Sequence, residues 1–255
     1  MIEKLKRHQF LFEELVKRDF KKKYKGTALG MLWSVISPLL TLLVLALVFT
    51  TFFGDSIPHF LTYLFAGNLI YSFFNEATSQ GMTCLIENAP IFSKVNVPKF
   101  LFILSKNSQT LINFLINLGV FFAFCLFDNI SFTWKFVLLL YPILYMLLIN
   151  MGIGMILSAL FVFFRDMQYL WSVFSMLLMY MSAIFYSIDV FSPMAQNLFL
   201  LNPVYLGIRY FRKIVIDGAI PSLWFHFLML AFVVLTVGLG RWMYKKFNTI
   251  FLYYL

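Results

Sequence analysis

Few residues of this 255-residue chain could perform covalent chemistry or bind a metal, and those few are scattered. His8, His59 and His226 lie in three separate segments, so they make neither a metal-ligand spacing nor the base of a catalytic triad. The sequence also contains no G-x-x-x-x-G-K-[ST] motif, which excludes a phosphate-binding P-loop. We therefore expect no catalytic residue, no metal site and no cofactor bound by this chain. Any energy that it uses must come from a partner or a gradient.

Glu76 is the acidic residue placed deepest in an apolar segment, within the polar run 75–80. Because a carboxylate is unfavourable in lipid, one interpretation is a proton or cation site. The other interpretation, which the sequence favours, is a carboxyl that is protonated or hydrogen-bonded in the packing. Three asparagines also have two interpretations: they could line a hydrophilic path, or they could form hydrogen bonds between helices. They are Asn113, Asn117 and Asn150.

Aromatic residues make up 20% of the chain, and two stripes of them follow one apolar segment at helical spacing. One stripe is Trp171, Phe174, Leu178, Met181 and Phe185, and the other is Tyr169, Met176 and Tyr180. Aromatic faces can hold the apolar faces of sugar rings. The alternative is a core or lipid-facing stripe with an interfacial aromatic belt, and the residues alone favour that alternative.

The composition indicates what kind of element must carry these residues. Hydrophobic residues reach 62% and charged residues only 12%, with a mean hydropathy of +0.86. Soluble domains are roughly 45–50% apolar and about 25% charged. The composition excludes a soluble enzyme, a disordered chain and a secreted disulfide scaffold. It predicts an all-α, polytopic membrane protein in which residues 1–255 form one domain.

Six apolar segments are long enough, or nearly so, to cross the hydrocarbon layer, which needs about 20 residues. They are 29–53, 60–85, 101–127, 135–163, 169–189 and 222–243. The second becomes polar in its latter half, which should therefore face protein or water.

The distribution of the basic residues predicts how the chain is oriented in the membrane. Nine of the twenty Lys and Arg residues lie within residues 4–25. With six spans, sixteen lie on the side of the termini and four on the other, which predicts cytoplasmic N and C termini. Residues 3–25 have the pattern of an amphipathic helix at the membrane surface. We expect these basic residues to meet anionic lipid rather than nucleic acid.

The segment 190–221 is apolar but is interrupted by proline, asparagine and glycine. Its fragments are too short to cross, so we expect two short re-entrant or surface helices on the outer side, the second over about 204–216. Its basic residues, Arg209, Arg212 and Lys213, could attract a phosphate group or extend toward lipid phosphates.

Four motifs, in this order and spacing, resemble the ABC-2 type permeases, and most closely the branch that exports polysaccharide, O-antigen or teichoic acid. Residues 18–33 read RDFKKKYKGTALGMLW, and residues 92–99 read FSKVNVPK. Residues 162–166 read VFFRD, and Asn202-Pro203 precedes a basic helix that contains 209–212. The resemblance extends over essentially the whole chain.

The resemblance implies the transmembrane subunit of an ATP-driven exporter of lipid-linked polysaccharide in the bacterial plasma (inner) membrane. Two copies of the chain would form a homodimer on two copies of a separate ABC ATPase, which would bind the ATP and magnesium. The cargo would be an undecaprenyl-type lipid-linked glycan. Alternatives left open are an ABC-2 permease for a drug or lipid, and a proton-coupled secondary carrier that uses Glu76.

The resemblance also implies roles by position. Residues 1–28 would form the cytoplasmic interface helix, 190–221 the outer gate and 244–255 the cytoplasmic tail. The ATPase-coupling residues would be Glu87, Phe92, Lys94, Val97, Lys99, Arg165 and Asp166. Spans one and five would line the channel, with glycan contacts at Trp33, Tyr169, Trp171, Phe174, Tyr180 and Phe185. At the outer gate, a pyrophosphate would meet Arg209, Arg212 and Lys213.

Overall fold

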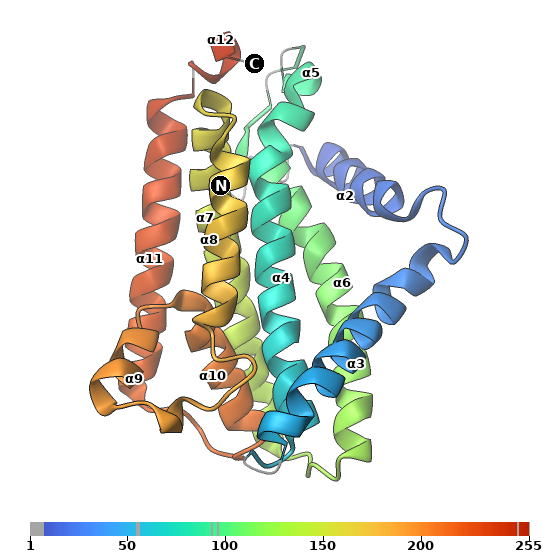
Figure 1. The fold of residues 1–255 in the computed structure, drawn as a ribbon. Helices are drawn as coiled ribbons and strands as arrows, with labels where there is room; N and C mark the ends of the chain where they lie inside the picture. Colours follow the sequence, from blue (N-terminus) through green and yellow to red (C-terminus); the bar gives the residue numbers. More distant parts are fainter. Residues whose placement is uncertain (1–7, 55–56, 93, 96, 249, 255) are drawn as a thin grey trace.

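The computed structural model describes residues 8–54, 57–92, 94–95, 97–248 and 250–254. Every regular element in these ranges is a helix, as the composition predicts. The long helices run alternately between the two ends of one bundle (Figure 1). The helices are α2 (Gln9–Tyr24), α3 (Trp33–Phe53), α4 (Phe60–Glu87), α5 (Ala89–Phe92), α6 (Phe100–Phe127), α7 (Leu140–Phe163), α8 (Met167–Tyr180), α9 (Pro193–Phe199), α10 (Pro203–Val215), α11 (Leu223–Lys246) and α12 (Phe251–Tyr254), with short 3₁₀ turns η1 (Gly30–Leu32), η2 (Trp134–Leu139) and η3 (Ile188–Val190).

Among the described residues, four helical stretches are long and apolar enough to cross a membrane. They are Gly30–Phe52, Phe100–Phe127, Trp134–Phe163 and Leu223–Lys246. The protein is thus a multi-pass membrane protein. The other two predicted spans differ from these four. Helix α4 has 28 residues, but its polar residues lower its hydropathy. Helix α8 has 14 residues, about 21 Å, which is shorter than the hydrocarbon layer.

Helix α8 also ends earlier than the predicted segment 169–189. It stops at Tyr180, and the chain then turns, with Ala183 at a left-handed φ of 50°. The apolar pattern continues past this point, so periodicity alone does not mark the break. The two short helices after it, α9 and α10, lie within the segment 190–221 where two were expected.

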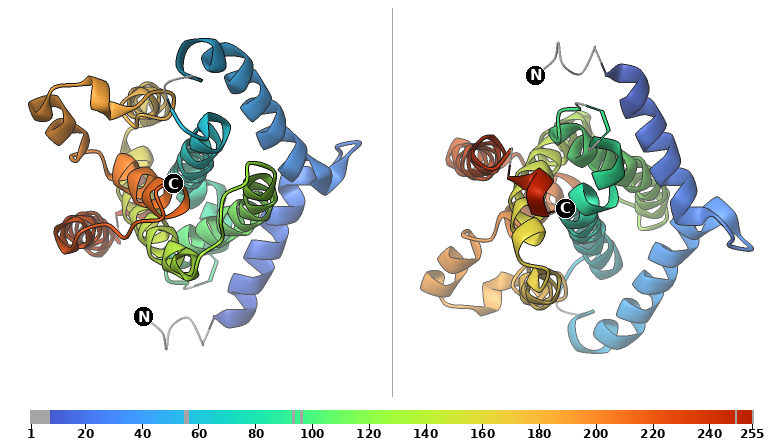
Figure 2. Two further views of the ribbon diagram at one scale, coloured as in Figure 1. Left: turned by 90° about the horizontal axis from the view of Figure 1, so that it is seen from below. Right: turned by 90° about the horizontal axis from the view of Figure 1, so that it is seen from above.

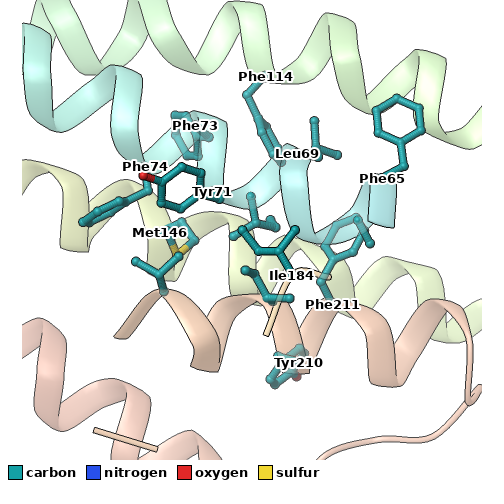
Figure 3. Close-up of a cluster of buried hydrophobic side chains, with 14 of the residues drawn as sticks. Phe65, Leu69, Tyr71, Phe73, Phe74, Phe114, Met146, Ile184, Tyr210 and Phe211 are labelled. Carbon is teal, nitrogen blue, oxygen red and sulfur yellow. The ribbon is translucent and has the colours of Figure 1, made fainter. Parts of the chain in front are cut away.

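Helix α4 is at the centre of the bundle and packs against α6 and α7. A Cβ atom added to Gly81 of α4 would lie 3.2 Å from the Cα of Gly154 of α7, so glycine at both positions lets these backbones approach closely. Further along, Phe65 meets the ring of Phe121 edge-on at 5.4 Å. Figure 3 shows the buried side chains that fill this core, among them Phe211.

The two ends of the bundle differ. Helices α5 and α12 lie at one end, with α2 beside the bundle toward that end, and α9 and α10 lie toward the other end (Figure 1). Viewed along the bundle, α2 and α3 follow one another around one side (Figure 2). We name the two ends after the expectations from the sequence: the end with α2, α5 and α12 is called the coupling end, and the end with α9 and α10 the outer end.

Candidate functional site

At the coupling end, charged side chains attach α2 to α4 and α6. Asp19 of α2 and Lys106 of α6 are both 5% exposed, and the Lys106 Nζ lies 3.4 Å from the Asp19 Oδ2. The same Nζ lies 3.0 Å from the Glu87 Oε2. Arg18 donates to Asp19 at 2.7 Å and to Asn88, just after α4, at 2.8 Å. Paired buried charges of this kind fix one position of α2.

Glu76 belongs to a second link between the same helices. Lys23 of α2 donates to its Oε1 at 2.7 Å, and the Asn113 amide of α6 donates to the same oxygen at 3.2 Å. The Tyr24 hydroxyl donates to Asn113 at 3.0 Å. Glu76 is thus a hydrogen-bonded carboxyl, as the sequence favoured. The sequence did not reveal its basic partner, because Lys23 lies 53 positions away.

Glu87, predicted to contact an ATPase, is engaged within the chain. Partial burial by itself would raise the pKa of its carboxyl. The hydrogen bond from Thr83 and the charges of Lys106 and Lys22 outweigh that effect, so its pKa lies below the usual value. Glu87 is therefore ionised at neutral pH and stabilises the attachment of α2.

The other predicted coupling residues divide into two groups. Lys94, Arg165 and Asp166 are exposed and can meet a partner. Val97 is buried, and the Lys99 Nζ donates to the Asn248 carbonyl oxygen at 2.8 Å. The side chain of Phe92 lies outside the described residues.

The C-terminal segment packs onto this end. Phe251 of α12 is fully buried, with its ring 5.9 Å from that of Phe163 at the end of α7. It belongs to the same cluster as Val97 and Leu101. The C-terminal segment and the loop between α4 and α6 therefore pack together and form one surface at this end.

The six predicted glycan contacts also divide. Trp33, Tyr169, Phe174 and Tyr180 are exposed, whereas Trp171 and Phe185 are buried. Trp171 of α8 packs against Phe74 of α4, with ring centroids 6.0 Å apart. Phe185 stacks on Phe49 of α3 at 4.6 Å. The two buried rings therefore attach the start of α8 to α4 and the turn after α8 to α3.

At the outer end, Arg212 of α10 is buried rather than exposed. Its guanidinium donates to the carbonyl oxygens of Tyr63, Ala183 and Ile184 through four hydrogen bonds of 2.8 to 3.1 Å. These bonds use four of its five N–H groups. The Arg212 side chain therefore anchors α10 to α4 and to the turn that follows α8, and its predicted contact with a pyrophosphate stays a prediction.

All three predicted phosphate contacts, Arg209, Arg212 and Lys213, line a cavity of about 560 Å³ between the end of α3, η3 and α10. Asp189 and Asp217 line it too, so its charge is mixed. A second cavity, of about 830 Å³, lies at the coupling end between α2 and η1. Its lining combines the basic side chains of Arg18, Lys21, Lys22 and Lys25 with the apolar or aromatic side chains of Phe20, Tyr24 and Met31.

No group of three or more His, Cys, Asp or Glu side chains that could hold a metal occurs within the part of the chain that the structure describes. What the arrangement offers is a helical bundle with exposed basic residues at one end and a short-helix segment at the other. This arrangement is that of a multi-pass membrane protein.

The chain belongs to the ABC-2 type transporter family, whose model matches residues 11–216. It is also similar to the O-antigen export system permease protein RfbA of Myxococcus xanthus, with 27% identity over 224 residues that cover 87% of this chain and 86% of that protein. The protein of the same name from Klebsiella pneumoniae is 26% identical over 235 residues, covering 89% and 90% of the two chains. The ordered motifs thus indicated the correct family.

Proposed function

We propose that this chain is the membrane-spanning subunit of an ATP-driven exporter that moves lipid-linked polysaccharide across the bacterial inner membrane. The observation that carries the proposal is similarity to O-antigen export permeases over nearly the whole length of both chains. Two copies of the chain would span the membrane six times each and rest on two copies of a separate ABC ATPase. The ATP and magnesium would be bound by that ATPase.

The cytoplasmic side would be the coupling end, because Lys94, Arg165 and most other basic residues lie there. ATP-driven closure of the ATPase pair would move the loop between α4 and α6. The ion pairs of Lys106 would transmit this movement to α2. Helices α9 and α10 would then act as the outer gate.

The cargo would be an undecaprenyl-type lipid-linked glycan. Its lipid would remain in the bilayer, and its pyrophosphate would approach the basic side chains of α2 that line part of the cavity there. The exposed aromatic rings of Trp33, Tyr169, Phe174 and Tyr180 would contact the sugars.

Affinity purification of the chain from its native membranes tests the proposal. An ABC ATPase should copurify in stoichiometric amount, and its absence would contradict the assignment. Depletion of the chain should leave lipid-linked glycan on the cytoplasmic face. If an ATPase copurifies but no glycan accumulates, the cargo is a drug or another lipid.

A further inference from the structure

Four polar side chains form a line along one face of α4: Asn68, Ser72, Asn75 and Ser79. Their spacings of four, three and four residues place them on the same side of the helix. Ser72 is exposed and the other three are partly exposed. We call this set the polar stripe.

The polar stripe occupies the middle of the helix. Asn68 follows Phe60, the first residue of α4, by eight positions, and Ser79 precedes Glu87, the last, by eight. The stripe is therefore about 16 Å long within a helix of about 42 Å. A hydrocarbon layer is about 30 Å thick, so the stripe lies in the membrane-spanning part of the helix, with Asn75 and Ser79 close to Glu76, whose partner Lys23 belongs to α2.

Hydrogen bonding separates the polar stripe from the other polar side chains of α4. Thr62 donates to Asp128, Thr78 to the Phe74 carbonyl oxygen and Thr83 to Glu87. By contrast, no side chain of the stripe makes a hydrogen bond to any described residue. An unpaired amide or hydroxyl in hydrocarbon is unfavourable by several kcal/mol. The stripe must therefore face something that can hydrogen-bond.

The residues of α4 on either side of the stripe show which helices lie next to it. On one side the Tyr71 hydroxyl donates to the Ser175 carbonyl oxygen of α8 at 2.8 Å. On the other, the Phe73 ring lies 4.8 Å from Phe114 of α6. The stripe thus runs between the contacts with α8 and those with α6. Helices α8 and α3 lie on either side of α4 in Figure 1.

We propose that the polar stripe is the hydrogen-bonding floor of the export path and binds the hydroxyl groups of the sugar chain. Asparagine and serine side chains both donate and accept hydrogen bonds, as sugar hydroxyls do. Successive members are about 4.5–6 Å apart along the helix, a distance comparable with one sugar unit. The exposed aromatic rings of α8 supply the complementary contacts to the apolar ring faces.

This binding surface suits a polymer that must slide. Each side chain offers one weak, exchangeable hydrogen bond, and the bonds repeat along the direction of movement. Glu76 borders the stripe, four positions after Ser72, but its carboxylate accepts a hydrogen bond from Lys23 at 2.7 Å, so it is already paired within the chain. The inference rests on the proposed function, since it names the part of the chain that would contact the cargo.

Cysteine accessibility tests the position of the stripe without using the cargo. The native Cys84 and Cys125 are buried, so the unchanged chain provides a low background. In the permease–ATPase complex in native membranes, S72C and N75C should react with a small charged thiol reagent. The matched control is V234C on α11, where Val234 is 65% exposed within an apolar span; it should not react.

Two results of this test would overturn the inference. The first is labelling of S72C and N75C no greater than that of V234C, because the stripe would then face lipid. The second is an N75C disulfide-linked dimer that resists the reagent, because the stripe would then pack against a second copy of the chain.

Occupancy by the glycan is tested in the same membranes. Labelling of N75C should decrease when lipid-linked glycan is present, compared with membranes from cells that cannot synthesise it. Replacing Asn68 and Asn75 with leucine should lower export about fivefold for each lost hydrogen bond, with ATPase copurification unchanged. The control is Asn117→Leu on α6, whose amide already donates to the Asn113 carbonyl oxygen; it should preserve export.

The outcomes distinguish the two proposals. Normal export by the leucine variant, or labelling that glycan does not reduce, would overturn the polar stripe as a sugar-binding surface. Absence of glycan accumulation on depletion would instead contradict the proposed function, whatever the labelling result.

Discussion

The guanidinium of Arg212 holds three segments together at the scale of a single residue. It links α10 to the Tyr63 carbonyl of α4 and to the Ala183 and Ile184 carbonyls beyond the end of α8. Gly67 leaves the space for it, because a Cβ atom there would lie 2.5 Å from the Arg212 Nη2. A planar, forked donor is needed to reach these carbonyls together.

We expect Arg212→Lys to destabilise the protein by about 3 kcal/mol, since an ammonium group leaves buried carbonyls without donors. The midpoint of thermal unfolding of the purified protein measures the effect. Arg209→Lys is the matched control on the same helix, and it should change stability by less than about 1 kcal/mol, because a lysine retains the cation–π contact with Phe225. Equal midpoints for the two variants would contradict the anchoring role.

At the scale of an element, the attachment of helix α2 to helix α6 depends on a buried ion pair. Asp19→Asn leaves Lys106 with one carboxylate fewer in a buried position, so we expect a loss of about 3 kcal/mol. Glu14→Gln removes an exposed ion pair with Lys17 on the same helix and should change stability by less than about 1 kcal/mol. Thermal unfolding of both variants measures the difference. Similar losses of stability in the two variants would contradict the prediction that the buried ion pair contributes more than the exposed one.

Glu87 makes the same attachment depend on pH. Because its pKa in the folded protein lies below the usual value, its ionised form contributes stability above the pKa of the unfolded chain, about 4.3. That contribution is lost as the pH falls through the folded pKa. The wild-type protein should therefore exceed Glu87→Gln in unfolding midpoint at neutral pH, and the difference should shrink below about pH 4. A difference that is constant with pH would contradict this role.

Helices were predictable from the sequence where an apolar run is long. Segments 60–85 and 101–127 differ from α4 and α6 by at most two residues at either end. Pairing between distant side chains was not predictable. The helical spacing of Trp171 defines a face of α8, but only the fold shows that Phe74 covers it. The break at Tyr180 was missed for the same reason, since its anchor, Arg212, lies 32 positions later.

At the scale of the whole molecule, the exposed basic residues at the coupling end define the surface that an ATPase would meet. Lys94 and Arg165 come from separate loops, and we expect the double variant Lys94→Glu, Arg165→Glu to lose ATPase copurification because it reverses both charges. Lys99 is a poorer choice for this test, since its change would also disturb the C-terminal segment at Asn248. Lys135→Glu, in η2 at the opposite end of the bundle, is the control and should retain the ATPase. Retention of the ATPase by the double variant would move the docking surface away from these loops.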